Sequence, residues 1–299
     1  MGVGCGGTEG QALNLFIFGC GYSASYFART RAASFTAISG TQRDGARAAA
    51  LVGAAGLQFD GAAHDARLPE RLAQADALLV SIPPDGAADP ALRAFRAEIA
   101  AAPRLRRIAY LSTIGVYGDH AGAWVDEASA TQPGSARNKA RVGVEQQWLA
   151  LGAETGKAVS VLRLAGIYGP GQNVLEKLRE GSAQRIVKPG QVFNRIHVED
   201  IARAIGAALA GDHAGVCNVS DDEPAPPQDV MLFAASLLGI APPPPLDFAT
   251  AALSPMARSF YGDNKRVRNA RLKRELAVAL AYPTYREGLR ALAGAQKAV

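Results

Sequence analysis

Residues 13–29 read LNLFIFGCGYSASYFAR, and this stretch decides the fold class. A mostly apolar run leads into three small residues, Gly19, Gly21 and Ala24, which are spaced as G-x-G-x-x-A. A glycine at the first position permits a tight turn, and one at the second lets backbone amides approach a pyrophosphate. A small third residue lets the following helix pack closely on the strand. The stretch therefore predicts the first strand–turn–helix unit of a dinucleotide-binding fold, with an ordinary glycine turn as the alternative.

The rest of the chain continues this alternation of strand and helix patterns. Ala-, Arg- and Leu-rich helical stretches separate short apolar runs at residues 13–18, 35–39, 57–59, 77–81, 108–112 and 159–164. Continuous apolar runs of this length are typical of parallel strands that are covered on both faces. Their alternation with helices indicates βαβ units. The sequence therefore predicts an α/β fold built on a doubly wound parallel Rossmann sheet.

After residue 164, glycine and proline become frequent, which predicts a smaller C-terminal substrate domain. Helices are expected at 198–209 and 229–238, with a strand at 216–219 between them. The expected division has three parts. It assigns 1–12 to a flexible Gly-rich tail, 13–164 and 194–220 to the NAD(P)-binding Rossmann domain, and 165–193 and 221–299 to the smaller domain.

The composition of the 299 residues, 48% hydrophobic with a net charge of +5, is that of a globular protein. The basic residues are scattered and lack interleaved aromatic residues, so we expect no nucleic-acid partner. No apolar run approaches the ~18 residues of a membrane helix, and the first residues lack the features of a signal peptide. Cys5, Cys20 and Cys217 are odd in number and show no metal-ligand spacing, which predicts a reduced, cytoplasmic protein without a metal site.

The end of the second predicted strand, SGTQRDG, bears on the choice between NAD and NADP. An NAD site usually has an acid here for the ribose diol, but residues 36–43 contain none. Arg43 is instead well placed for a 2′-phosphate, which favours NADP while leaving NAD possible. Asp44 could take the acid role if the loop bends differently, and Arg43 could be an ordinary surface residue.

Further cofactor contacts are expected after the other strands. Asp60 follows the third strand, where it could reach an adenine amino group or simply form a turn before Gly61. The segment after the fourth strand would pass close to the adenosine and nicotinamide. The full set of predicted cofactor-binding residues is Gly19, Gly21, Tyr22, Ser23, Ala24, Arg43, Asp60, Ser81, Ile82 and Pro83.

Five segments, FIFGCGYSA, YLSTIGVYGD, RLAGIYGPG, RIHVEDIARAI and GVCNVSDDEP, follow one another in this order. With them the chain resembles the short-chain dehydrogenase/reductase superfamily, specifically its NAD-dependent epimerase/dehydratase (extended) branch, from about residue 13 to 285. The resemblance implies an NAD(P)-dependent oxidoreductase, epimerase or dehydratase for a small or nucleotide-linked carbonyl or alcohol. The G-x-G-x-x-A loop is similar to that of the atypical subgroup, and the helix from about residue 135 implies a possible homodimer.

Members of this superfamily use a Ser or Thr, a Tyr and a Lys. The resemblance places the hydroxyl at Thr113, with Ser112 beside it. Counting back from Glu145 places Arg137 at the tyrosine position and Arg141 at the lysine position. A guanidinium does not deprotonate in proteins, so Arg137 cannot exchange a proton as a tyrosine does. The chain therefore resembles members that lack the Tyr-x-x-x-Lys pair.

Two questions follow from this replacement, and the sequence leaves both open. The proton could come from Tyr117, Asp119, His120, a water relayed by Thr113, or bulk solvent; Tyr117 could equally be a packing aromatic. Arg137 and Arg141 are one helical turn apart and could bind an anion. Alternatively, Arg141 and Glu145 could form an ordinary surface pair.

Five other residues are candidates for the site or its edge. Tyr261 and Lys265 form a literal Tyr-x-x-x-Lys in the predicted smaller domain, but their place in the chain argues against catalysis. His197 is expected to be structural, Arg195 to face the substrate cleft and Tyr168 to line it. Two functional alternatives to an enzyme remain: a non-catalytic NADP(H)-sensing regulatory protein and a scaffold with a structural cofactor.

Overall fold

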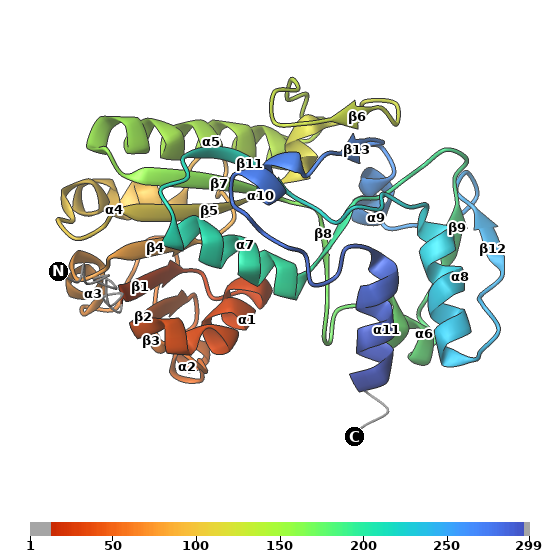
Figure 1. Ribbon diagram of the computed structural model, residues 1–299, viewed down its shortest axis with the longest axis horizontal. Coiled ribbons are helices and arrows are strands. Elements are labelled where there is room, and N and C mark those ends of the chain that lie inside the picture. The colour runs from red at the N-terminus through yellow and green to blue at the C-terminus, as the bar shows by residue number, and fades with distance from the viewer. Residues whose placement is uncertain (1–12, 296–299) are drawn as a thin grey trace, which may run out of the picture.

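A computed structural model describes residues 13–295 and contains a seven-stranded parallel sheet (Figure 1). The strand order is β11-β7-β5-β4-β1-β2-β3. The strands are β1 (Leu13–Phe18), β2 (Phe35–Gln42), β3 (Ala55–Gln58), β4 (Ala77–Val80), β5 (Arg107–Thr113), β7 (Ala158–Leu164) and β11 (Gly215–Val219). The predicted α/β doubly wound fold is confirmed, and each predicted strand is present.

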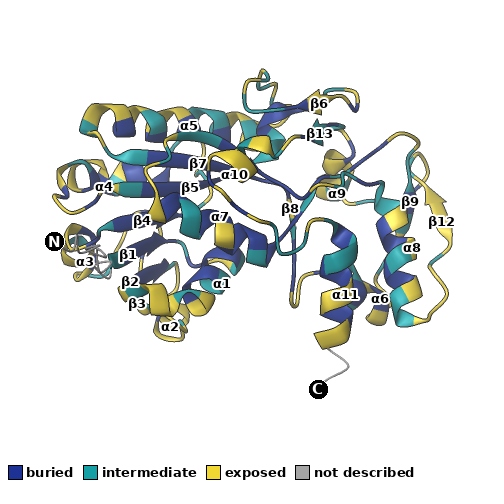
Figure 2. Ribbon diagram, in the orientation of Figure 1, coloured by how far each residue is buried: buried dark blue, intermediate teal, exposed yellow. Residues whose placement is uncertain are grey.

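Helices cover both faces of the sheet because alternate residues of each strand point to opposite sides. In β1, Leu15 and Ile17 belong to one core and Phe16 and Phe18 to the other. Figure 2 shows the strands as a buried layer between partly exposed helices. The first core is covered by α1 (Tyr22–Thr30) and α7 (Val198–Ala210), and the second by α3 (Leu68–Ala73), α4 (Pro90–Ala101) and α5 (Ala136–Thr155). The short helix α2 (Gly45–Ala49) contacts β2 and β3.

A smaller lobe lies beside the sheet, at the right of Figure 1, around an apolar core that includes Leu175, Ala234 and Leu289. Two parallel strand pairs, β8 with β10 and β9 with β12, cross this region. The elements are β8 (Gly166–Tyr168), α6 (Val174–Arg179), β9 (Arg185–Val187), β10 (Arg195–His197), α8 (Pro227–Leu238), β12 (Pro245–Asp247), α9 (Pro255–Phe260) and α11 (Tyr285–Ala295).

Two sets of contacts bear on the predicted division of the chain, which itself stays a prediction. First, β10 pairs with β8 and not with the main sheet, although the chain then returns to that sheet as β11. Second, β13 (Arg266–Val267) pairs with β6 (Trp124–Val125), and α10 (Ala270–Arg274) places Leu272 in the core beneath α7. The segment around β13 and α10 therefore packs on the Rossmann part, because two-residue strands and short helices have no sequence period that reveals their partners. The predicted flexible tail, 1–12, lies outside the described residues.

Across residues 13–295, no helix combines the length and the apolar character that a membrane crossing requires.

Candidate functional site

The loop between β1 and α1 has the geometry that the glycine pattern predicts. Gly19 has a φ of +86°, and a Cβ at this position would lie 2.7 Å from Ile82 Cγ1 and 3.1 Å from the Ile82 nitrogen. Only glycine avoids both the strained dihedral and the collision. Gly21 differs, because its φ of −76° suits any residue and an added Cβ would meet no atom within 4 Å. The first glycine makes the turn, whereas the second leaves open space in front of the helix.

Two residues at the end of β2 hold this loop in place, and sequence analysis missed both. The Gly19 amide donates to Thr41 Oγ1 at 2.8 Å, and the Cys20 amide donates to the Thr41 carbonyl at 2.9 Å. Gln42 Nε2 donates to the Cys20 carbonyl at 2.5 Å. The sequence did contain a signal for Thr41 and Gln42, namely their position. Polar residues that end a strand beside a glycine turn are placed to bind the backbone of that turn.

The N-terminus of α1 is free to receive an anion. Its N-cap is Gly21, which provides no side-chain acceptor, and the first turn contains no acid. The first amides of a helix lack partners within the helix and carry partial positive charge, so they attract phosphate groups. Ser23 and Ala24 are buried within the helix's packed face, whereas the Tyr22 hydroxyl donates to the Pro170 carbonyl at 3.0 Å.

A pocket of about 480 Å³ adjoins this loop between α1 and α2. Arg29 of α1 and Arg47 of α2 both line it, and sequence analysis missed both. Arg43 lies exposed at the end of β2. Asp44 is the N-cap of α2 and accepts from the Arg47 amide at 2.9 Å, which is a structural role and not that of a ribose ligand. The full lining is Cys20, Gly21, Tyr22, Ser25, Tyr26, Arg29, Gln42, Arg47 and Pro170.

The remaining predicted cofactor residues lie along the same edge of the sheet. Asp60 Oδ1 accepts from the amides of Ala62 and Ala63 at 2.9 and 2.8 Å, and these bonds lower the pKa of this exposed carboxyl. The Asp60 side chain thus closes a turn before the rest of the loop, which is the alternative to an adenine contact that the sequence left open. The residues after β4 range from half-buried (Ser81 and Ile82) to exposed (Pro83).

The predicted surface pair between Arg141 and Glu145 is wrong, because both side chains are buried and have other partners. Arg141 Nη1 donates to the Tyr110 hydroxyl at 2.9 Å and to the Leu111 carbonyl at 2.8 Å. Glu145 forms a buried ion pair of 2.7 Å with Arg163 and accepts from Ser112 Oγ at 2.5 Å. The available signal was Arg163 itself, since a charged residue in an otherwise apolar strand requires a buried partner.

Tyr117 has the environment of a packing residue and not of a proton donor. It is fully buried, its hydroxyl donates to Asn218 Oδ1 at 2.8 Å, and the Arg163 guanidinium lies 4.8 Å from its ring centroid. Burial raises the pKa of Tyr117, the opposite of what an acid–base residue near neutral pH needs. The predicted catalytic role of Tyr117 is therefore not supported by its surroundings.

Thr113 is the hydroxyl that remains available at the end of β5. It is half-buried, and its Oγ1 accepts from the Gly115 amide at 3.1 Å, at the start of the 3₁₀ turn η2 (Ile114–Tyr117). Because Oγ1 is the acceptor in that bond, the hydroxyl proton is free to be donated. The first turn of α5 adjoins this loop, since a Cβ on Gly115 would lie 2.8 Å from Asn138 Nδ2. Arg137, in the same turn, is exposed.

The second Tyr-x-x-x-Lys match has structural contacts. Tyr261 packs against the rings of Phe193 and Phe248, with centroids 5.1 and 5.0 Å away. Lys265 Nζ donates to the Gly118 carbonyl at 2.7 Å and lies 3.6 Å from Asp263. Lys265 thus holds the loop that follows η2, closer to the Rossmann part than its place in the sequence indicates.

His197 and Arg195 are both turned into the protein. The His197 ring accepts from the Glu199 amide at 3.1 Å and caps α7, the structural role that the sequence predicts. Arg195 Nη1 donates to the carbonyls of Phe193 and Ala225 at 3.0 and 3.1 Å, so the expectation that it faces a cleft is wrong. Tyr168 is buried, and its hydroxyl has no hydrogen-bond partner.

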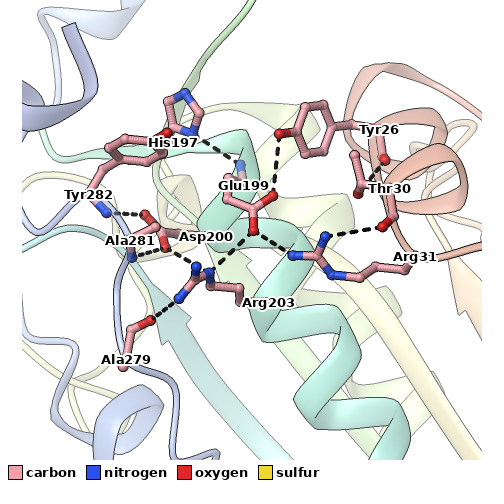
Figure 3. A network of polar contacts seen from close by, with 10 residues as sticks. All are labelled: Tyr26, Thr30, Arg31, His197, Glu199, Asp200, Arg203, Ala279, Ala281 and Tyr282. Atoms are coloured by element: carbon pink, nitrogen blue, oxygen red, sulfur yellow. Dashed lines mark hydrogen bonds and ion pairs between the residues drawn. The ribbon is translucent and has the colours of Figure 1, made fainter. Parts of the chain in front are cut away.

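A polar network around the start of α7 joins α1 to the chain segment before α11 (Figure 3). Glu199 accepts from Tyr26 at 3.3 Å, from Arg31 at 2.5 Å and from Arg203 at 3.2 Å. The neighbouring Asp200 accepts from the amides of Ala281 and Tyr282 at 2.6 and 3.0 Å. Because Tyr26 also lines the pocket beside the glycine loop, this network connects the pocket's wall to the segment leading into the smaller lobe.

His197 should make the protein sensitive to acid. Burial lowers the pKa of His197 from 6.5 to about 4. In the folded state, His197 therefore takes up a proton less readily than in the unfolded chain. The stability that comes from keeping this ring neutral is fully present above about pH 6.5 and is lost as the pH falls towards 4. We expect His197→Asn, which retains a capping acceptor, to reduce the loss of unfolding free energy between about pH 7 and 4.5 by roughly 2 kcal/mol.

Urea denaturation at the two pH values measures this difference. The exposed His64 is the control, because His64→Asn should leave the pH dependence as in the wild type. Equal acid sensitivity of the wild type and His197→Asn would contradict the prediction.

No cluster of three or more His, Cys, Asp or Glu side chains able to hold a metal ion occurs in the part of the chain that the structure describes. The arrangement at the carboxyl edge of the sheet instead combines a glycine loop, an uncapped helix N-terminus and a pocket with two arginines. Such an edge is where open α/β sheets bind dinucleotides.

Comparison with known proteins agrees with this geometry. The sequence profile of the NAD-dependent epimerase/dehydratase family matches residues 92–220. Protein YeeZ of Escherichia coli is 30% identical over 235 residues, which cover 72% of this chain and 74% of YeeZ. The chain belongs to the NAD-dependent epimerase/dehydratase family.

Two further relatives show how far the likeness extends. A conserved protein of unknown function from Silicibacter pomeroyi DSS is 48% identical, with a TM-score of 0.87 over 95% of this chain and 99% of that one. A 3-diazoavenalumate denitrifying reductase from a Streptomyces species is 30% identical over 143 residues. That match covers 43% of this chain and 45% of the reductase, so it spans less than half of either protein. Members of the family bind NAD(P) and small-molecule substrates.

Proposed function

We propose that this protein binds NADP(H) and reduces or oxidises a small carbonyl or alcohol, as an atypical member of its family without the Tyr/Lys pair. The observation that carries the proposal is the pocket beside the glycine loop. Its wall contains Arg29 and Arg47, and the uncapped N-terminus of α1 adjoins it. A dinucleotide with an additional phosphate supplies the negative charges that such a site lacks.

The described residues fit this cofactor at each end of its adenosine diphosphate part. The open space at Gly21 admits a pyrophosphate to the first amides of α1. Three arginines near the end of β2 are available for a 2′-phosphate. Residues 36–43 contain no acid that would repel this phosphate. Arg43 and Arg47 flank the start of α2, and Arg29 extends from α1.

When bound, the nicotinamide supplies or accepts a hydride. The chain's part is to hold the substrate oxygen, and Thr113 is the residue that can donate a hydrogen bond to it. Ser112 is not available for this role, because its hydroxyl is donated to Glu145.

Tyr117 is buried, and Arg137 cannot give up a proton. Asp119 accepts from two backbone amides, and His120 Nε2 lies 3.1 Å from the Tyr117 carbonyl. Of the sources that the sequence left open, we therefore assign the proton to a water relayed by Thr113.

A fluorescence titration with NADPH and then NADH tests the proposal. We expect NADPH to bind at least about tenfold more tightly, a difference of about 1.4 kcal/mol. Arg47→Ala should remove most of that preference and leave NADH binding unchanged. The control is Arg71→Ala, which removes an exposed arginine of α3 far along the sequence from the pocket.

Each other outcome has a distinct meaning. Equal affinity for NADH and NADPH would contradict the assignment of the arginines to a 2′-phosphate. Failure of both cofactors to bind would contradict the proposed function as a whole.

One observation favours a second candidate, a non-catalytic protein that senses NADP(H). Both positions of the family's Tyr/Lys pair hold arginines, and the neighbouring Tyr117 and Ser112 hydroxyls are committed to protein partners. Transfer of deuteride from 4-deuterated NADPH to a panel of aldehydes separates the two candidates. The enzyme transfers it to some member of the panel, whereas the sensor transfers none.

A further inference from the structure

Two arginines of α5, the exposed Arg137 and the buried Arg141, lack carboxylate partners within ion-pair distance. Arg137 and Arg141 are one helical turn apart, and no Asp or Glu lies within ion-pair distance of either in residues 13–295. Glu145, one turn further along, is bound to Arg163 and Ser112. Their positive charge is therefore not neutralised by the obvious neighbour on their own helix.

Arg141 carries this charge in a buried place. Its side chain is only 8% exposed, its Nη1 bonds go to two neutral oxygens, and its Nε has no hydrogen-bond partner. The buried carboxylate of Asp89 interacts with this charge electrostatically, but its hydrogen bonds come from Trp148 Nε1 and from two amides at the start of α4. Arg141 therefore has no carboxylate in ion-pair contact, and its charge is only partly offset by Asp89. The Arg141 guanidinium lies between α5 and β5, since both of its hydrogen-bond partners, Tyr110 and Leu111, belong to that strand.

The first turn of α5 adds to the charge of Arg141. Ser135 caps the helix, and the first turn contains Arg137 and Lys139 but no acid. Cations are unfavourable at this end of a helix, because the helix dipole is itself positive there. Asp263 lies near Gly134, but it is paired with Lys265 at 3.6 Å. Among the described residues, no acid forms an ion pair with Arg137 or Lys139, which favours an anion that comes from outside the chain.

This positive region adjoins the place where the substrate oxygen would be held. The Asn138 carboxamide contacts Gly115, two residues after Thr113, so the first turn of α5 borders the loop that begins at Thr113. Arg137 is exposed in that turn, so its guanidinium can reach a ligand.

We infer that Arg137 binds an oxyanion of the substrate, a carboxylate or a phosphate, beside the carbonyl held at Thr113. The inference rests on the proposed function, which assigns the carbonyl to Thr113. A guanidinium binds a carboxylate or a phosphate with paired hydrogen bonds. The buried charge of Arg141, one helical turn further along α5, adds to the attraction. The substrate is therefore a carbonyl compound with an acidic group, and Arg137 recognises that group in place of exchanging a proton.

The first experiment measures anion binding without cofactor. Protein labelled with ¹⁵N is titrated with inorganic phosphate and, separately, with acetate, and the amide signals of residues 136–139 are followed. We expect the signals of these residues to shift saturably with each probe. The probe that binds more tightly identifies the oxyanion. Arg137→Ala should weaken binding by at least about tenfold and Arg137→Lys by less, whereas the control Lys139→Ala should weaken it by less than about threefold. Unchanged binding in Arg137→Ala, or no binding of either probe, overturns the inference.

The second experiment compares matched carbonyl compounds with NADPH present. Succinic semialdehyde is paired with butanal, and glyceraldehyde 3-phosphate with glyceraldehyde. The wild type should prefer the charged member of one pair, and Arg137→Ala should lose that preference without a change in NADPH affinity. If NADPH fails to bind while the anion still binds at Arg137, the proposed function fails and the anion site stands. If NADPH binds and Arg137→Ala leaves the anion titration unchanged, the anion site fails and the proposed function stands.

Discussion

Replacing Gly21 by valine should abolish NADPH binding and leave the fold intact. The backbone at Gly21 has a φ of −76°, and an added Cβ would meet no atom within 4 Å, so the protein itself tolerates the side chain. The same side chain would fill the space through which a pyrophosphate reaches the first amides of α1. We expect NADPH affinity to fall at least about 100-fold, or about 2.7 kcal/mol, and the free energy of unfolding to change by about 1 kcal/mol at most.

Gly19→Ala is the matched comparison within the same loop. Its φ of +86° and the 2.7 Å approach to Ile82 make any side chain costly to the fold. Stability and NADPH binding should therefore fall together in Gly19→Ala, whereas they separate in Gly21→Val. Fluorescence titration and urea denaturation of both variants measure the two effects. Wild-type NADPH affinity in Gly21→Val would show that the phosphates do not bind at α1.

Replacing Glu145 by alanine should cause the largest loss of stability. The substitution leaves Arg163, which is almost fully buried, without its carboxylate, and it also removes the acceptor of the Ser112 hydroxyl. Breaking a buried ion pair from one side costs about 3–5 kcal/mol, because the remaining charge stays buried and unpaired. Urea denaturation followed by circular dichroism measures the change.

The control lies on the same helix. Glu154 pairs with Arg96 at 2.5 Å, but both side chains are exposed, so Glu154→Ala should cost less than about 1 kcal/mol. Changing Glu145 to Leu together with Arg163 to Met should recover much of the loss, because no unpaired charge remains. Equal costs for Glu145→Ala and Glu154→Ala would contradict the buried-pair argument.

The local geometry was predicted correctly where one short segment contains both the pattern and its consequence. The glycine loop is such a segment, since Gly19, Gly21 and Ala24 lie within one turn and its helix. The supports of that loop were missed, because Thr41 and Gln42 contact it only through the parallel pairing of β1 with β2. Arg29 and Arg47 were missed for a similar reason, since helix packing brings them to one pocket.

The sequence by itself determined the class of fold and the place of the glycine loop, and it placed arginines where the family usually has a tyrosine and a lysine. Each of these depends on residue type and short-range spacing: apolar runs of strand length, a glycine pattern, and arginines where a tyrosine and a lysine are usual. Such features act through the local backbone and through side-chain chemistry, which do not change with the surroundings.

Only the tertiary structure decided the surroundings of the two arginines, Arg137 and Arg141. Their spacing was equally compatible with a surface pair and with an anion site, because a helical period shows which residues share a face but not what covers it. The packing of α5 on β5 and β7 buried Arg141, gave Glu145 to Arg163 and left Arg137 exposed. Partners so far apart in the chain are selected by burial, since a charge removed from water must find the counter-charge that the fold places beside it.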